Sequence, residues 1–257
     1  MGRLDGLGIV ITRPLPAARA MARDLAAEGA RTFLFPALAI EALEGSPALG
    51  EALDLLPRAR MAIFVSANAV EHGLAAVRRH AAWPPALQVA AIGQATAEAL
   101  RNSGFERVIS PREGEDSEAL LALAELQADR VSGENVVIFR GEGGRERLKD
   151  ELQARGAQVV YAECYRRSRP PGDPAALLRA LADGEVQAIS AMSGETLQNF
   201  VAMVGEAGAS GLAGTVLVVP HEAVGRHPAA RAFERVVVCG PGIEGLTHAL
   251  SRLRVIP

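Results

Sequence analysis

The sequence predicts an α/β fold built from two similar halves. Short apolar runs alternate with stretches of helical periodicity, most of which end at glycine, and this alternation is typical of βα units with parallel sheets. A second observation is an internal repeat, because landmarks of the first half recur about 127 residues later. A third is a pair of extended, charged or proline-marked stretches at 35–43 and 161–174, one after each copy of the first repeated unit.

The predicted strands are the apolar runs, which are short, rich in Val and Ile, and bounded by turn residues. In chain order they cover residues 8–12, 31–35, 61–66, 87–92, 107–110, 135–139, 157–161, 186–190, 215–219 and 235–239. Between most of them lie helical stretches of about 10–15 residues, which complete the βα units.

The repeat predicts how the chain divides. The matching landmarks are Arg13 and Arg140, Gly29 and Gly156, Ser66 and Ser193, and the Phe-Glu-Arg-Val segments at 105–108 and 233–236. If the chain crosses between lobes at both extended stretches, residues 1–39 and 166–257 form one lobe. Residues 40–165 then form a second, inserted lobe. We expect two linker strands side by side as a hinge, with a cleft between the lobes.

Composition excludes several classes of protein. With 257 residues and 49% hydrophobic content the chain is globular, and its net charge of -3 does not favour nucleic acid as a partner. It has neither an apolar run of membrane-spanning length nor a signal-peptide pattern, so we expect a cytoplasmic protein that does not bind membranes. Lys149 is the single lysine, which leaves little scope for Schiff-base chemistry.

Cysteine and histidine spacing predicts neither a disulfide nor a metal site. Cys164 and Cys239 stand alone, and free buried thiols are the simplest interpretation. No two histidines have the spacing of a helical metal site, since His221-Glu222 lacks a second histidine at Gly225.

The stretch FRGEGGRERLKDELQARGA (139–157) predicts an anion site, because a glycine cluster lies between a strand and a helix. Glu146 stands where a dinucleotide fingerprint needs glycine, and Arg145 follows Gly144 where a phosphate loop needs lysine, so both nucleotide interpretations are weak. Further candidates fall at the carboxyl ends of predicted strands, where ligands bind in such sheets. They are Arg13, Ser66, Thr96, Arg140 and Ser193. Ser66 and Asn68 also suit a helix N-cap, and either arginine could instead pair with a nearby acid.

A set of motifs in a fixed order now points to one family. They are ITRP (11–14), FVSANAV (64–70), VAAIGQATAEALRNSGF (89–105), GEDSEALLAL around Ser117, the 139–157 stretch, and CYRR (164–167). In this order and spacing the whole chain resembles the uroporphyrinogen-III synthase family. The resemblance implies two α/β lobes joined by a two-stranded hinge, which agrees with the repeat.

The resemblance also implies a substrate and a site. The substrate would be hydroxymethylbilane, a linear tetrapyrrole with many carboxylates. A cofactor-free, cyclising hydro-lyase would close it with ring D inverted, through a spiro intermediate, for heme, siroheme or cobalamin synthesis. Tyr165 would be the general acid. The substrate-binding residues would be Arg13, Ser66, Asn68, Thr96, Ser117, Arg140, Gly144 and Ser193. The protein would be a monomer.

Some features leave other possibilities open. The repeat partner of Thr96 is Ala223, and Pro228 should break the helix that follows it. A non-catalytic two-lobe protein that binds a polyanionic small molecule would have the same lobes and anion-binding residues. It would not need Tyr165 as a catalytic group. A nucleotide-linked enzyme is a further alternative, which binding of NAD or ATP would reveal.

Overall fold

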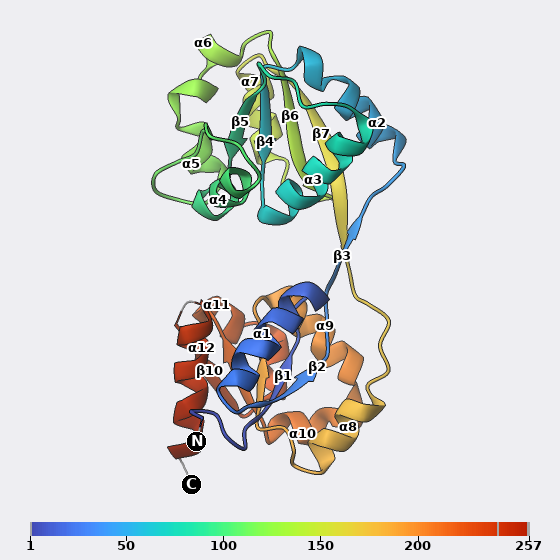
Figure 1. Ribbon diagram of the computed structural model, residues 1–257, viewed down its shortest axis with the longest axis vertical. Helices are drawn as coiled ribbons and strands as arrows, with labels where there is room; N and C mark the ends of the chain where they lie inside the picture. Colours follow the sequence, from blue (N-terminus) through green and yellow to red (C-terminus); the bar gives the residue numbers. More distant parts are fainter. Residues whose placement is uncertain (1, 241, 256–257) are drawn as a thin grey trace. The chain divides into compact units, whose positions relative to one another are not determined.

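The computed structural model describes residues 2–240 and 242–255, and these fold into two compact units (Figure 1). Unit 1 contains the described residues up to Ala39 and those from Ser168 onward, and unit 2 is Ile40–Arg167. Each unit is a sheet of mainly parallel strands with helices on both faces, which confirms the predicted α/β class.

Unit 1 has a five-stranded sheet in the order β2-β1-β8-β9-β10, and every pair of neighbours is parallel. The strands are β1 (Gly8–Ile11), β2 (Arg31–Leu34), β8 (Ala188–Ser190), β9 (Val216–Val219) and β10 (Arg235–Val238). This is the 2-1-3-4-5 order of doubly wound sheets, in which the strand order reverses between the first and third strands. Ligands bind beyond the carboxyl ends of the strands at that reversal, here between β1 and β8.

Two helical layers cover the sheet of unit 1. Buried residues of α1 (Leu15–Ala27) and α12 (Gly242–Ser251) pack on one face. The other face carries α8 (Ala175–Ala182), α9 (Gly194–Val204), α10 (Ala209–Ala213) and α11 (Glu222–Gly225). Short 3₁₀ turns at Glu206–Gly208, Pro228–Ala232 and Arg252–Val255 complete the unit.

Unit 2 has the strand order β3-β7-β6-β4-β5. The strands are β3 (Ala39–Ala42), β4 (Met61–Phe64), β5 (Gln88–Ala91), β6 (Asn135–Gly141) and β7 (Gln158–Ser168). The two linker segments pair, since β3 and β7 are neighbours and the Leu43 N–H donates to the Cys164 carbonyl at 3.1 Å.

The strand predicted at 107–110 is wrong, because only Ile109 pairs, in an isolated bridge to Ala90 of β5. The Ile109 N–H donates to Val89 and its carbonyl accepts from Ala91. The next donor of a parallel ladder would be residue 111, which is Pro111 and has no N–H. The ladder therefore stops after one residue.

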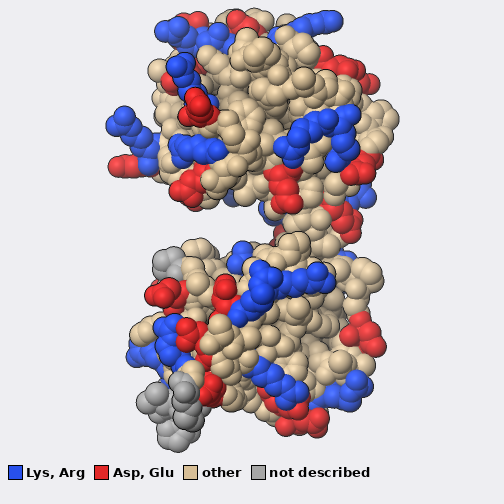
Figure 2. Space-filling model, in the orientation of Figure 1, with Lys and Arg blue, Asp and Glu red and all other residues tan. Residues whose placement is uncertain are grey.

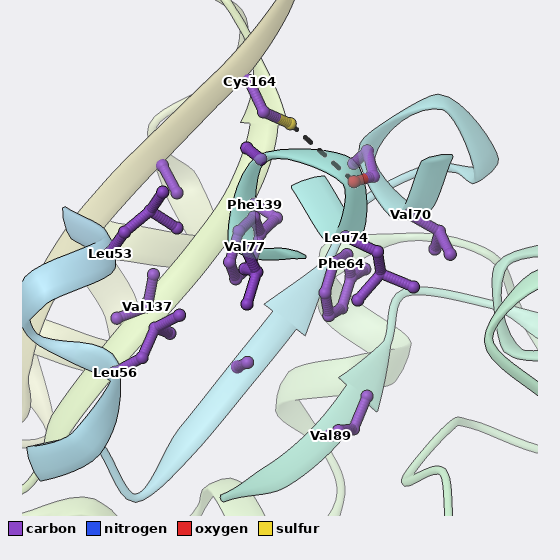
Figure 3. Close-up of a cluster of buried hydrophobic side chains, with 14 of the residues drawn as sticks. Leu53, Leu56, Phe64, Val70, Leu74, Val77, Val89, Val137, Phe139 and Cys164 are labelled. Carbon is purple, nitrogen blue, oxygen red and sulfur yellow. Dashed lines mark hydrogen bonds between the residues drawn. The ribbon is translucent and has the colours of Figure 1, made fainter. Parts of the chain in front are cut away.

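The helices of unit 2 also form two layers. One face of the sheet carries α2 (Pro47–Asp54), α3 (Ala67–His80) and α4 (Gln94–Asn102), whose buried side chains meet Phe64, Val137 and Phe139 (Figure 3). The other face carries α5 (Ser117–Leu121), α6 (Ala128–Val131) and α7 (Arg147–Ala154). The remaining 3₁₀ turns are Leu56–Arg58 and Ala124–Leu126.

The sequence repeat is a structural repeat. Strands β6, β7, β4 and β5 occupy the places in unit 2 that β1, β2, β8 and β9 occupy in unit 1, so the two sheets have the same spatial order with a permuted chain order. The repeated glycines Gly29 and Gly156 both have left-handed backbones, with φ of 95° and 88°, where a helix ends and a strand follows. Strand β3 covers the edge of β7, whereas in the described part of unit 1 no strand covers β2.

The break expected at Pro228 is confirmed. Helix α4 runs over nine residues, but its repeat partner α11 ends at Gly225 after four, and a 3₁₀ turn begins at Pro228. The proline ring and its missing N–H prevent the α-helical hydrogen bonds from continuing.

Candidate functional site

In unit 2 the strand order reverses between β4 and β6, and Ser66 lies just beyond β4. Ser66 has an extended backbone and caps α3, because its Oγ accepts the Ala69 N–H at 3.0 Å. The side chain is half-buried and satisfies one of the free N–H groups at the start of the helix. The capping role that the sequence allowed for Ser66 is therefore confirmed.

Tyr165 of β7 lies against the same helix start. Its hydroxyl is 3.1 Å from Ser66 Oγ, and its ring lies 5.6 Å from that of His72. The residue is only 3% exposed. A β-carbon on Gly141 would come within 2.8 Å of the ring, so only glycine leaves room for the phenol there.

A β-bulge directs Tyr165 toward α3. Along β7, Val160, Ala162 and Cys164 pack on the α3 face, and alternation would send the next residue to the opposite face. Between Arg140 and Gly141 the pairing shifts, so that Arg140 opposes Glu163 while Gly141 opposes Tyr165. The extra residue, Cys164, leaves both Cys164 and Tyr165 on the α3 face.

Arg140 is buried at the end of β6, with 5% of the residue exposed. Its Nε donates to the Gly141 carbonyl at 3.2 Å, and its terminal nitrogens donate to the carbonyls of Gly143 and Arg145 and to the Glu146 carboxylate. Four of its five N–H donors are therefore used within its own loop. The guanidinium also lies 4.3 Å over the Tyr161 ring. Of the alternatives for this arginine, the structure shows pairing with a nearby acid, Glu146.

The other predicted residues of unit 2 lie at helix starts. Thr96 is in the first turn of α4 and 5% exposed. Half-buried Asn68 is in the first turn of α3, so the cap expected at Asn68 is wrong, because Ser66 takes that position. Ser117 begins α5, which Asp116 caps. Gly144 has φ of 105° in the glycine loop. Among the described residues, no hydrogen bond joins these four to the Ser66–Tyr165 pair.

Unit 1 repeats the helix cap but not the tyrosine. Ser193 caps α9 by accepting the Thr196 N–H at 3.1 Å, as Ser66 does in α3. Position 38, which corresponds to Tyr165 in the repeat, is Leu38 and is buried. Arg13 follows β1 and is half-buried, and within the described part of the chain it has no hydrogen bond or ion pair.

Three contacts were not foreseen from the sequence. The His72 ring packs beside Tyr165, and Gly141 makes room for that phenol. In unit 1 the His227 ring lies against Gly194, the first residue of α9. His227 Nδ1 accepts the Ala229 N–H at 3.3 Å, so in the neutral ring the proton is on Nε2. The sequence signals for two of these contacts were the glycines at 141 and 194. Each follows a candidate site residue at a strand-to-helix turn, where the absence of a side chain leaves room for a neighbouring ring.

Burial shifts two ionisations near the site. Burial raises the pKa of the Cys164 thiol to about 12, and the thiol lies 3.4 Å from the Arg140 carbonyl. Figure 3 shows this thiol directed at the Ala69 carbonyl in α3. Burial also raises the pKa of Tyr161 to about 12, and the Glu146 carboxylate adds to the effect. Both groups stay neutral at physiological pH.

Neither the charged surface in view nor the described His, Cys, Asp and Glu side chains form a single concentrated cluster. Figure 2 shows acidic and basic side chains interspersed over both units on the face in view. Among the described residues, no cluster of three or more His, Cys, Asp or Glu side chains is arranged to hold a metal ion. None of the described helices is both long enough and apolar enough to span a bilayer.

Fold and site together define a class of protein with two doubly wound units that share the spatial order of four strands. In each unit a serine caps a helix start and an arginine lies at the end of a strand where that order reverses, and unit 2 adds a tyrosine. A sequence model described as "Uroporphyrinogen-III synthase HemD" matches residues 19–248. The chain belongs to the uroporphyrinogen-III synthase family, and it is an enzyme.

Named relatives agree with this membership. The chain is 38% identical over 194 residues to uroporphyrinogen-III synthase of Salmonella typhimurium, an alignment that covers 75% of this chain and 78% of that one. It is 32% identical over 199 residues to the Escherichia coli enzyme, with 77% and 80% covered. Family membership decides against the two alternatives that the sequence left open.

Solved structures show the same fold. A crystal structure of a mutant uroporphyrinogen III synthase from Thermus thermophilus has a TM-score of 0.58 at 17% identity, covering 96% of this chain and 99% of that one. Uroporphyrinogen-III synthetase from Helicobacter pylori has a TM-score of 0.55 at 14% identity, covering 97% and 98%.

Proposed function

We propose that the enzyme is a cofactor-independent hydro-lyase that closes hydroxymethylbilane to uroporphyrinogen III with inversion of ring D. The observation that carries the proposal is the Ser66–Tyr165 hydroxyl pair at the strand reversal of unit 2, in a chain of this family. In the first step the C–O bond of the terminal hydroxymethyl group breaks. The oxygen leaves as water with a proton from the Tyr165 phenol, and the pyrrole nitrogen stabilises the cationic carbon.

Ser66 supports that proton transfer. Its Oγ already accepts the Ala69 N–H, so its own O–H is free to donate to the phenolic oxygen as negative charge develops there. Because Tyr165 is almost fully covered and Ser66 is half-buried, we expect the substrate hydroxyl to approach from the Ser66 side. General acid catalysis of this kind typically contributes about 10²–10⁴-fold.

The second requirement is to hold a flexible polyanion. We propose that Arg13 and Ser193 in unit 1, and Asn68, Thr96, Ser117 and Gly144 in unit 2, bind carboxylates of the substrate. The support is their position at helix starts and strand ends, where free N–H groups and the helix dipole favour anions. Orientation of the two chain ends supplies the larger catalytic effect, which reaches about 7–11 kcal/mol in well-oriented cases.

The product isomer tests this function. In water the bilane closes to the type I macrocycle by direct attack of the free α-position of ring D, whereas type III requires attack at the substituted position, through a spiro intermediate. We expect the purified, chelator-treated protein to give mainly type III, with activity falling as salt screens the carboxylate contacts. Type I alone, at the rate of a control without enzyme, would contradict the proposal.

We also propose that the enzyme works as a cytoplasmic monomer. Large hydrophobic side chains that are exposed in the described part, namely Leu15, Leu34, Val236 and Val238, are spread over α1, β2 and β10. Sedimentation velocity at increasing concentration tests the oligomeric state, and a species of twice the monomer mass would contradict it.

A further inference from the structure

The two repeat-related arginines have diverged in their contacts. Arg13 has no hydrogen bond or ion pair in the described part of the chain, whereas Arg140 has used four of its five donors within its own loop. We propose that Arg140 is a positioning residue: it pins the loop 141–146, and this loop holds Tyr165 in place. The inference rests on the proposed role of Tyr165.

The first step is that Arg140 fixes the loop. Its guanidinium bonds the carbonyls of Gly143 and Arg145 and lies 3.1 Å from the Glu146 carboxylate. These carbonyls belong to a loop whose residues from Glu142 to Glu146 are otherwise exposed. A buried cation that binds several carbonyls of one loop holds them in one arrangement, since losing any of them leaves charge unpaired.

Gly144 shows how closely the loop fits around the cation. A β-carbon there would lie 2.5 Å from an Arg140 terminal nitrogen, and φ is 105°. At Gly143 a β-carbon would meet nothing within 4 Å, although φ is 72°. Both positions need a left-handed backbone, but only Gly144 also needs the space that the guanidinium occupies.

The second step is that the loop holds Tyr165. The Glu142 N–H donates to the Tyr165 carbonyl at 2.7 Å, and Gly141 lies against the phenol ring. On the other side of the bulge the Gly143 N–H donates to the Glu163 carboxylate at 3.0 Å. The loop thus bonds β7 on both sides of Cys164, the extra residue that turns Tyr165 toward Ser66.

Limited proteolysis with trypsin tests whether Arg140 fixes the loop, and it needs no assay of enzyme activity. Arg145 and Arg147 are exposed cleavage sites in and beside the loop. We expect Arg140→Gln to speed cleavage after Arg145 several-fold, while the matched control Arg130→Gln, at an exposed site in the same unit, does not. Gly144→Ala should act like Arg140→Gln and exceed Gly143→Ala. Unchanged cleavage in both Arg140→Gln and Gly144→Ala overturns the inference.

Steady-state kinetics test whether the loop holds Tyr165 in place. A 1 Å displacement of a catalytic group lowers rates by about 10²-fold, so we expect Arg140→Gln to reduce kcat on that order with KM within about twofold. Arg140→Lys keeps the charge but not the planar fork and should restore little of kcat. In a Tyr165→Phe background the same substitution should cost little more, because both act through one hydroxyl. A raised KM at unchanged kcat, or effects that multiply, overturns positioning.

The two proposals can fail separately. If Tyr165→Phe alone keeps full turnover, the general-acid role of Tyr165 is wrong, and the cleavage rates still decide whether Arg140 pins the loop. If Arg140→Gln does not fold, Gly144→Ala against Gly143→Ala makes the same comparison with the arginine retained.

Discussion

The hydroxyl of Tyr165 lies 3.1 Å from Oγ of Ser66, although 99 residues separate them in the chain. Ser66 is held by the start of α3 and Tyr165 by a bulge in β7, so two rigid elements fix the pair. This relationship places two hydrogen-bonded hydroxyl groups at the strand reversal of unit 2, where ligands of doubly wound sheets bind.

Replacement of Tyr165 by Phe should separate catalysis from packing. The ring stays, and only the hydroxyl and its bond to Ser66 are lost. We expect kcat to fall by about 10²–10⁴-fold with KM nearly unchanged and stability lower by about 1 kcal/mol. Tyr161→Phe is the matched control on the same strand. Full turnover of the Tyr165 variant would reduce the residue to a packing role.

The repeat-related caps offer a paired test. Ser66→Ala and Ser193→Ala each remove a side-chain acceptor from the first turn of a helix, which should lower the free energy of unfolding by about 1 kcal/mol. Only Ser66 contacts Tyr165, so its variant should also lose kcat, whereas Ser193→Ala should raise KM. Urea titrations and steady-state kinetics measure both. Equal kinetic effects in the two variants would count against an assignment of the proton-transfer step to unit 2.

Tyr161 should contribute through its ring and not its hydroxyl. The ring lies under Arg140 at 4.3 Å and under Lys149 at 4.8 Å. The hydroxyl is buried near the Glu146 carboxylate but has no partner of hydrogen-bond geometry among the described residues. We expect Tyr161→Phe to change the free energy of unfolding by less than about 0.5 kcal/mol, and Tyr161→Leu to lower it by about 1–2 kcal/mol. A large loss in the Phe variant would show that the hydroxyl has a partner in solution.

Stability should fall at alkaline pH because of Cys164. In the unfolded chain this thiol ionises near its ordinary pKa of 9.0, but burial raises its pKa in the folded protein to about 12. The unfolded state therefore releases a proton first. The stability is fully present below pH 9 and is lost as the pH rises toward 12, with a slope of at most about 1.4 kcal/mol per pH unit.

Cys164→Ala should flatten that dependence. The chain has one lysine, two tyrosines and one other cysteine, Cys239, and all four are present in both proteins, so the difference between them reports Cys164. Unfolding free energies between pH 8 and 11 should converge for the two proteins as the pH rises. Curves that stay parallel would mean that the folded thiol ionises normally.

We propose that unit 2 folds as an independent domain. A fragment of residues 40–167 contains all five strands of its own sheet except the end residues Ala39 of β3 and Ser168 of β7. A fragment of residues 1–128 instead leaves β1 and β2 without β8, and β4 without β6. The first fragment should give a cooperative unfolding transition by circular dichroism and the second should not. The reverse result would favour two domains in sequence order.

The sequence by itself determined the fold class, the repeat and the capping role of Ser66. Strand and helix periodicity, the glycines at 29 and 156, and the serines at 66 and 193 are local signals, since each depends on backbone conformation or on hydrogen bonds within a few residues. For the same reason Pro228 predicted the broken helix correctly. The motif order then gave the family, and with it the activity.

Tertiary structure alone decided what the site residues contact. Alternation along β7 predicts that Cys164 and Tyr165 face opposite sides, and only the pairing with β6 introduces the bulge that puts both beside α3. Likewise Arg13 and Arg140 are equivalent in the repeat, yet Arg13 has no hydrogen bond or ion pair in the described part of the chain and Arg140 is enclosed by its loop. Such differences depend on contacts between segments distant in the chain, and periodicity and spacing carry no information about them.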